Sequence, residues 1–394
     1  MATKTKNKNK ITKIKEKIFK KEQKNNNWKI ATFVLLVLLL LGCGVLISQS
    51  SIINSSSFVE FKPSPVLKYK NTADPLSLWT KESRLKNELV DYMKKITDKN
   101  SKDFIPVNDR VAVFDFDGTL FCETNPVYLD HRLEYHRLVE DEDYKNKASV
   151  YERQVAVKIK SFMDTGKSDE YLPIEHGKCV ASSFKGMTVD ELYDYIDGYI
   201  SQDEPNYTNM KTKDAYYQPM VQVVDYLNKN GFKVYVVSGT DRFLTRAFVK
   251  DALNIPMRQV IGSDELLKAT NQNYTDGLDY QLVTDDKVVL SGDFQIKNLK
   301  MNKVTVIERE IGQQPVLAFG NTSGDYSMAT FTTSNNKYLA KAFMVCCDDL
   351  DRENGNLEKA KNMVDHCNEV GWTPISMKND FVTIYGDNVE YIKH

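Results

Sequence analysis

The stretch VAVFDFDGTL, Val111 to Leu120, decides the fold expected for this chain. Its first four residues are apolar, a pattern typical of a strand buried on both faces inside a parallel sheet. Asp115 and Asp117 follow, and their spacing of two points both side chains to one side of an extended chain. Gly118 then allows a sharp turn. Because open parallel sheets bind ligands outside the carboxyl ends of their strands, we expect the functional site here.

Two interpretations of the Asp115 and Asp117 pair are open. Close carboxylates repel each other unless a positive charge lies between them, and a hard divalent cation bound by oxygens is the simplest such charge. The alternative is a strand end capped by two solvated aspartates in an Asx turn. The full pattern DxDGT[LV], directly after an apolar strand, strongly favours the first interpretation.

A second segment, GFKVYVVSGT from Gly231 to Thr240, again places a small polar turn after an apolar strand. The hydroxyl of Ser238 and the backbone N–H groups around Gly239 stand where a helix is expected to begin, which is a common place to bind an anion. Asp241 is interpreted mainly as the cap of that helix. On its own this pattern also fits an ordinary loop between a strand and a helix.

A third segment, PVLAFGNTSGDYSM from Pro315 to Met328, predicts a strand followed by a Gly-rich loop that carries Asn321 and Asp325. A dinucleotide-binding site is excluded, because GNTSGD follows a late strand and lacks the GxGxxG spacing.

Together these segments resemble the motifs of the haloacid dehalogenase superfamily, in the same order. The resemblance implies that Asp115 is a nucleophile that becomes an aspartyl phosphate and that Asp117 is the general acid and base. It also implies that Ser238 holds the phosphoryl group, with Gly118 and Gly239 as further substrate-binding positions. Dehalogenases themselves lack the second Asp, so its presence here favours phosphoryl transfer.

The resemblance further implies a Mg²⁺ ion bound by Asp115, the backbone carbonyl of Asp117 and Asp325. Asn321 stands where the family's fourth motif has its first acid, which removes one charge from the metal site, although its carbonyl oxygen can still bind the ion.

A phosphoryl transition state also needs a positive charge near its nonbridging oxygens. In the family a Lys at a helix start supplies this charge. Lys303 fits best, with a helix capped by Asn302, while Lys300 and Lys297 are the rivals.

The long segment between Leu120 and Gly231 is rich in Glu, Lys and Tyr, and helices are expected at 127–139, 150–163, 189–200 and 216–228. A helical insertion at this point resembles the cap of the phosphoserine phosphatase branch, which would exclude water from the site.

The same resemblance implies that Glu123 binds the substrate, although a surface Glu is the simpler interpretation. The charged positions of the first helix are likewise expected on an exposed face, with the mouth of the pocket as the alternative: His131, Arg132, His136 and Arg137. No counterpart is found for the arginine that grips the carboxylate of phosphoserine, so phosphoserine itself is not implied.

The amino-terminal segment differs sharply in composition from the rest. Residues 1–29 contain eleven Lys and two Glu, and the 18 residues from Ile30 to Ile47 carry no charge. An apolar run of this length spans a bilayer as a helix, and the Lys excess before it predicts a cytoplasmic amino terminus. Basic tails also bind nucleic acid, but the apolar span favours a membrane. A lipobox-like sequence at Cys43 leaves a lipid anchor as the alternative.

The expected fold is therefore α/β, with a doubly wound, mostly parallel sheet, a helical cap inserted after the first strand, and a transmembrane helix before them. Further elements are expected as a helix at 77–96, a strand at 257–262, a hairpin at 281–291, a strand at 342–346 and a helix at 356–369. The expected domains are a disordered basic tail at 1–29, an anchor at 30–49, a linker at 50–75, a core at 76–120 and 216–394, and a cap at 121–215.

The sequence thus predicts a membrane-anchored, outward-facing phosphatase that uses Mg²⁺ and acts on a small phosphorylated metabolite. Two alternatives remain: an inactive surface binding module that kept the fold, with Asn321 as the first sign of decay, and a phosphotransferase that uses the same residues. The six cysteines show no zinc-ligand spacing, so no zinc site is predicted, and pairing among Cys346, Cys347 and Cys367 is left open. The sequence does not predict an oligomeric state.

Overall fold

The computed structural model describes residues 15–17, 20, 28, 62–69, 73–123 and 128–393. Lys62–His394 forms one compact unit, to which every element described below belongs. The expected anchor at 30–49, with Cys43, lies outside the described residues, as do nearly all of the tail at 1–29 and much of the linker at 50–75. Of the helices in the described ranges, none is both long and apolar enough to cross a membrane.

Seven strands of the described chain form one sheet, in the order β4-β3-β2-β1-β5-β6-β7. Their bounds are β1 Val111–Phe114, β2 Lys233–Asp241, β3 Val260–Ala269, β4 Val288–Ile296, β5 Leu317–Gly320, β6 Lys341–Cys346 and β7 Thr373–Ser376. Only the β3–β4 pair is antiparallel. The predicted α/β class with a mostly parallel sheet is confirmed. The strand order reverses at β1, which places a topological switch point there.

Both faces of the sheet are covered by helices, as the uninterrupted apolar run of β1 predicts. Ala112 and Phe114 belong to one hydrophobic core and Val113 to another, so alternate side chains of β1 enter opposite layers. The first core also contains residues of α2 (Arg84–Thr97), α7 (Gln218–Lys229) and α8 (Arg242–Val249). The second contains residues of α9 (Met301–Val306), α10 (Tyr326–Thr333) and α11 (Leu357–Val370), and the short α12 spans Met377–Asp380.

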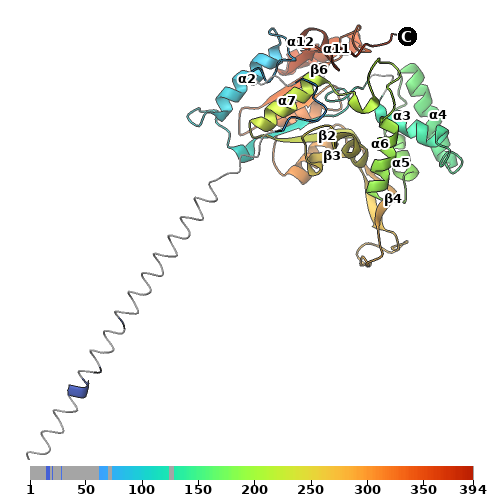
Figure 1. The fold of residues 1–394 in the computed structure, drawn as a ribbon, viewed down its shortest axis with the longest axis horizontal. Helices are drawn as coiled ribbons and strands as arrows, with labels where there is room; N and C mark the ends of the chain where they lie inside the picture. The colour runs from blue at the N-terminus through green and yellow to red at the C-terminus, as the bar shows by residue number, and fades with distance from the viewer. Residues whose placement is uncertain are drawn as a thin grey trace, which may run out of the picture. The chain divides into compact units, whose positions relative to one another are not determined.

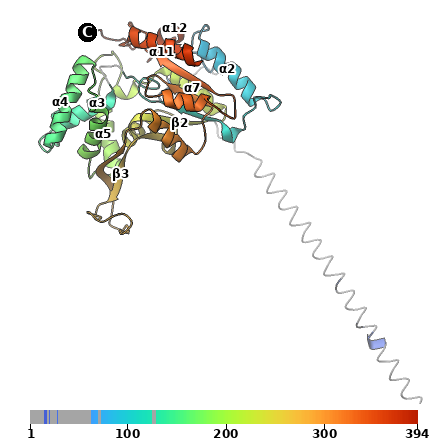
Figure 2. The same ribbon diagram turned by 180° about the vertical axis from the view of Figure 1, so that it is seen from behind.

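A group of helices lies between β1 and β2 in the sequence and stands beside the sheet (Figures 1 and 2). These helices are α3 (Leu129–Tyr135), which continues as a π-helix over His136–Glu140, α4 (Val150–Thr165), α5 (Leu172–Ser183) and α6 (Val189–Ile200). They include a small core of their own, in which Leu138, Val155 and Ile159 are buried. We call this group the cap.

The structure explains why α5 was missing from the sequence-based prediction. Its sequence LPIEHGKCVASS carries a glycine in the helix interior, which weakens a helix pattern. A Cβ on Gly177 would lie 2.6 Å from the ring of Phe294 on β4, so the glycine allows helix and strand to approach closely. By contrast, α4 and α6 begin at capping boxes led by Ser149 and Thr188, and both starts agree with the predictions.

Several predicted elements need correction. The predicted hairpin at 281–291 is wrong, because 288–296 is strand β4 and pairs with β3, which extends to Ala269. The loop between them closes on Asp286, whose carboxylate accepts hydrogen bonds from the backbone of Asn271 and Val283. The helix predicted from residue 77 begins only at Arg84, capped by Ser83. The five described cysteines, Cys122, Cys179, Cys346, Cys347 and Cys367, are free thiols.

Glu134 of α3 gives the cap a testable pH dependence. It is completely buried, and burial raises its pKa to about 8. The unfolded chain loses the carboxyl proton near the ordinary pKa of 4.5, whereas the folded state keeps it until about pH 8. The free energy of unfolding therefore falls as the pH rises from 4.5 toward 8. We expect Glu134→Gln to reduce the fall in unfolding free energy between pH 5 and pH 9 by about 2–4 kcal/mol. Urea unfolding at both pH values checks this, and the exposed Glu170→Gln should leave the fall unchanged.

Candidate active site

The carboxyl ends of β1, β2 and β5 meet at one edge of the sheet, and a cavity of about 210 Å³ lies over them beneath the cap. Asp115 and Asp117 follow β1, Thr240 lies near the end of β2, and Asn321 follows β5. The cavity is lined by Asp115, Asp117, Glu123, Tyr128, Asp130, His131, Phe162, Ser168, Pro173, Gly239, Thr240, Lys297, Leu299, Lys303, Asn321, Thr322 and Asp325.

Lys303 lies at the centre of this edge. Its Nζ donates to Asp115 Oδ1 at 2.6 Å and to Asp325 Oδ1 at 2.7 Å, and only 1% of the residue is exposed. Burial works against its charge, but Asp115 and Asp325 outweigh burial and raise the pKa of Lys303. The ammonium group therefore stays charged between two carboxylates.

The two rival lysines do not contact Asp115 or Asp325 in the way that Lys303 does. Lys300 is exposed, whereas Lys297 lines the cavity. Asn302 was predicted to be the N-cap residue of the helix that carries Lys303, and this prediction is wrong. Helix α9 begins at Met301, and Lys300 occupies the N-cap position. Asn302 instead lies within the first turn, where its side chain donates to the backbone oxygen of Lys297 at 2.8 Å.

Asp115 is buried beside Lys303. Burial and the nearby Asp325 raise the pKa of Asp115 to about 7, although Lys303 acts in the opposite direction. The carboxylate of Asp325 is held by the loop after β5: its Oδ2 accepts the backbone N–H groups of Asn321 and Thr322, both at 3.0 Å. A bound divalent cation would favour the ionised form of Asp115.

Asp117 has a different environment. Its Oδ2 lies 2.8 Å from Thr240 Oγ1, and the same hydroxyl lies 3.1 Å from Oδ2 of Asp130 on α3. Burial, followed by Asp130 and Asp115, raises the pKa of Asp117 well above its usual range. The Thr240 hydroxyl has one proton and can donate it to only one of the two carboxyl groups. If Asp117 is protonated, it can donate to the Thr240 oxygen, and Thr240 can then donate to Asp130. This arrangement suits a proton donor.

Ser238 does not lie where the sequence suggested. It is completely buried, its hydroxyl accepts the backbone N–H of Thr240 at 3.0 Å, and it is not among the residues that line the cavity. The cavity wall at this strand end consists of Gly239 and Thr240. As predicted, Asp241 caps the following helix by accepting the N–H groups of Phe243 and Leu244.

Glu123 lies in the cavity wall, so its interpretation as a surface residue is wrong. Its carboxylate accepts a hydrogen bond from the Asn321 side-chain amide, and burial raises the pKa of Glu123 to about 7. Gly118 makes this contact possible: its φ is +73°, and a Cβ there would lie 1.8 Å from Asn321 Nδ2. Any side chain at position 118 would displace Asn321.

The donor set at this edge fits Mg²⁺. Asp115, Asp117, Asn321 and Asp325 offer oxygen atoms only, which this cation prefers. Asn321 Oδ1 is buried and has no hydrogen-bond partner among the described residues. An orphaned buried oxygen is costly, and a cation would satisfy it. With a buried carboxylate, a proton donor and a cationic side chain, the donor set is that of a phosphoric monoester hydrolase.

Sequence reasoning missed several residues of the cavity. Thr240 belongs to the predicted polar turn but was given no role, and Asp130 carried no signal beyond its place beside His131. The exposed face expected for the four positions in 131–137 is wrong: His131 lines the cavity, and the other three form ion pairs and do not line it. Those pairs are Arg132 with Glu204, His136 with Glu140 and Arg137 with Asp141.

Comparisons with solved structures find similar chains at low identity. One is a conserved protein of unknown function from Anaerococcus prevotii, with 14% identity and a TM-score of 0.46, over 77% of this chain and 96% of that one. Another is cytosolic 5′-nucleotidase IIIB bound to cytidine, with 11% identity and a TM-score of 0.45, over 78% and 92%. A third is a phosphoserine phosphohydrolase-like protein from Francisella tularensis, with 15% identity and a TM-score of 0.35, over 66% and 99%.

No curated protein matches the chain. The family model described as haloacid dehalogenase-like hydrolase matches residues 112–330, which is more than half of the chain and runs from β1 to α10. This range includes Asp115, Lys303 and Asp325, whose side chains meet at the sheet edge. The chain belongs to the haloacid dehalogenase-like hydrolase family.

Proposed function

We propose that this hydrolase is a magnesium-dependent phosphatase that acts on small phosphomonoesters through a phosphorylated Asp115. The observation that carries the proposal is the pair of contacts from buried Lys303 to Asp115 and Asp325, at the foot of a cavity lined by cap residues. It is an arrangement of charges suited to an anionic phosphoryl group.

In the first half of the reaction, a carboxylate oxygen of Asp115 attacks phosphorus and forms an acyl phosphate. The ester P–O bond breaks, and Asp117 gives its proton to the leaving oxygen. The raised pKa of Asp117 supports this role, since the residue has to hold a proton before the bond breaks. Lys303 stabilises the negative charge on the transferring group.

In the second half, Asp117 takes a proton from water, the water oxygen attacks phosphorus, and the bond between phosphorus and Asp115 breaks. Phosphate leaves and both carboxyl groups regain their first state. Asp115, the backbone carbonyl of Asp117, Asn321 and Asp325 would hold Mg²⁺, which when bound supplies charge that stabilises the phosphoryl oxygens.

The substrate class follows from the size and walls of the cavity. Its volume of about 210 Å³ favours a small ester, and Tyr128, Phe162 and Pro173 provide apolar surface for the leaving group. Glu123 stays available for a polar or cationic group of the substrate. We include a membrane tether in the proposal, on the basis of the eleven Lys of residues 1–29 and the uncharged stretch from Ile30 to Ile47.

The first prediction concerns the nucleophile. We expect Asp115→Asn to lower magnesium-dependent release of phosphate from p-nitrophenyl phosphate by about 10³-fold or more, because an amide cannot form the acyl phosphate. Colorimetric phosphate release checks this, with the exposed Asp143→Asn as a control of unchanged rate. Normal hydrolysis by Asp115→Asn would contradict the proposal, and a wild-type chain that releases no phosphate from a panel of esters would favour a binding module. An added alcohol acceptor that collects the phosphate would instead identify a transferase.

The second prediction concerns the buried cation. We expect Lys303→Met to lower the free energy of unfolding by about 3–5 kcal/mol, because it leaves two buried carboxylates without their partner. Phosphate release should fall as well. The matched control is Lys300→Met, which removes an exposed ammonium group three residues away. Urea unfolding and phosphate release measure the two effects. Equal stability and equal activity of the Lys303→Met and Lys300→Met variants would contradict the proposed role of Lys303.

The third prediction concerns the tether. We expect the full chain to sediment with membranes and a chain that begins at Lys62 to stay in the supernatant, since the second lacks the apolar stretch. Protease added to intact cells should cleave the catalytic domain if it faces outward. A full chain found in the supernatant would contradict the tether and would leave the proposed reaction untouched.

A further inference from the structure

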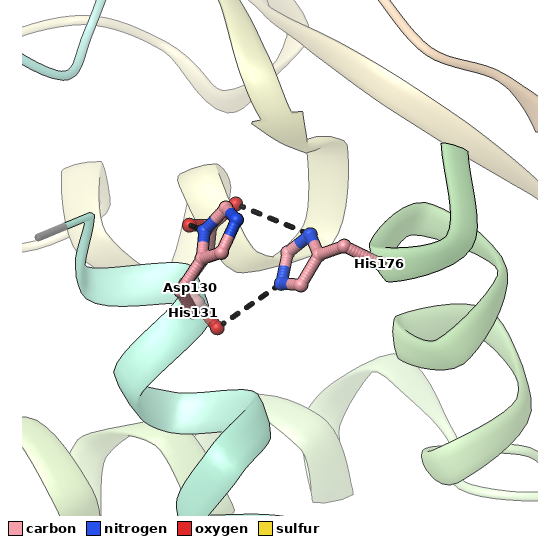
Figure 3. Close-up of side chains that lie close together, drawn as sticks. All are labelled: Asp130, His131 and His176. Carbon is pink, nitrogen blue, oxygen red and sulfur yellow. Dashed lines mark hydrogen bonds and ion pairs between the residues drawn. The ribbon is translucent and has the colours of Figure 1, made fainter. Parts of the chain in front are cut away.

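Three side chains that the proposed reaction does not use as ligands or nucleophiles lie together on the cap side of the cavity. Asp130 and His131 are neighbours on α3, and His176 projects toward them from α5 (Figure 3). All three are buried, and one potential ligand atom from each lies within 4.8 Å of the others.

His176 is the member whose environment is unexplained by protein contacts. It is 1% exposed, and its Nε2 lies 3.4 Å from the backbone oxygen of Asp130, to which an Nε2–H would donate. This contact leaves the lone pair on Nδ1. Nδ1 lies 3.9 Å from Asp130 Oδ2 and has no hydrogen-bond partner among the described residues.

His176 Nδ1 and Asp130 Oδ2, both of which carry lone pairs, thus face each other across a gap of 3.9 Å, which is too long for a hydrogen bond. A tetrahedral zinc ion binds imidazole nitrogen and carboxylate oxygen at about 2.0–2.2 Å, which places the two ligand atoms roughly 3.4 Å apart. A shift of about half an ångström would therefore bring Nδ1 and Oδ2 to the separation of two zinc ligands. The contact from Nε2 to a backbone carbonyl is also the usual way in which a protein orients a metal-binding histidine.

His131 completes the set. Its ring stacks on that of His176 with centroids 4.0 Å apart, and its Nδ1 lies 2.7 Å from Asp130 Oδ1. Both rings are buried, so each can bind a metal only together with the other groups of the cluster. A metal lies in the plane of each imidazole that it binds, so binding would tilt the two rings out of their parallel stack.

We propose that Asp130, His131 and His176 form a second metal site, selective for a divalent transition metal such as Zn²⁺, on the cap wall of the catalytic cavity. Two imidazoles and one carboxylate differ from the oxygen-only set at Asp115 and Asp325, so the two sites select different metals. Three protein ligands leave a coordination position open, which an oxygen or nitrogen atom of a ligand in the cavity would occupy.

The site would also connect the cap to the sheet. Thr240 Oγ1 on β2 lies 3.1 Å from the same Asp130 oxygen that faces His176. A metal held by α3 and α5 would therefore fix Asp130 against Thr240, and through Thr240 against Asp117. Metal binding at this cluster does not depend on the proposed phosphatase reaction.

The test is Co²⁺ binding to the full chain, prepared without a polyhistidine tag, stripped with chelator and kept in excess Mg²⁺. We expect one equivalent of Co²⁺ to bind and to give visible absorption bands typical of a low-coordinate site with nitrogen ligands. His176→Gln should weaken binding at least about 10-fold, in line with the loss of one ligand. Asp325→Asn, at the proposed magnesium site, and His366→Gln, on α11, should each keep both the affinity and the spectrum.

Folding of each variant is checked by circular dichroism. If His176→Gln does not fold, His131→Gln carries the same expectation. Unchanged Co²⁺ affinity in a folded His176→Gln or His131→Gln would overturn the proposal, as would Co²⁺ binding that is lost in Asp325→Asn or competed away by Mg²⁺. None of these readouts depends on turnover, so failure of the metal site and failure of the phosphatase proposal are distinguishable.

Discussion

A buried ammonium group between two buried carboxylates is the interaction on which the rest of the site depends. The ammonium group of Lys303 is paired with Asp115, which follows β1, and with Asp325, which follows β5. A shift of either strand would leave a buried charge without its partner. The adjacent pairing of β1 and β5 therefore serves both the fold and the site. Phe114 and Phe319, opposite each other in that pairing, stack with ring centroids 4.1 Å apart, and Asp115 directly follows Phe114.

Local sequence patterns were enough to predict the centre of the fold. The β1 stretch predicts a buried strand that ends just before Asp115, because an apolar run, two carboxylates and a glycine each act within a few residues. The amphipathic pattern of 189–200 predicts helix α6 with its observed bounds, and a capping box at Thr188 begins it. Because each motif consists of residues close together in the sequence, the motifs and their order were sufficient to identify the family from one sequence.

The remaining features depend on contacts between distant segments. The β3–β4 pairing joins segments separated by a long loop and includes register shifts, which no short pattern encodes. Ser238 is buried within β2, which continues through Asp241 and whose pairing with β3 shifts register between Val237 and Asp241. Glu123 lies in the cavity wall in contact with Asn321, which follows β5 and is distant in the sequence. Single-sequence reasoning has access to none of these partners.

The pairing of cap and sheet also bears on how a ligand enters. Beyond its two covalent connections, the cap is bonded to the β3–β4 hairpin: Leu290 donates to Met187 and accepts from Gly186, both at 2.9 Å. Phe294 of the same hairpin packs against Gly177. A lid that swings open as a whole must break these main-chain bonds or carry the hairpin with it. Any opening of the cavity that moves the cap as a whole therefore draws on the stability of the β3–β4 hairpin as well.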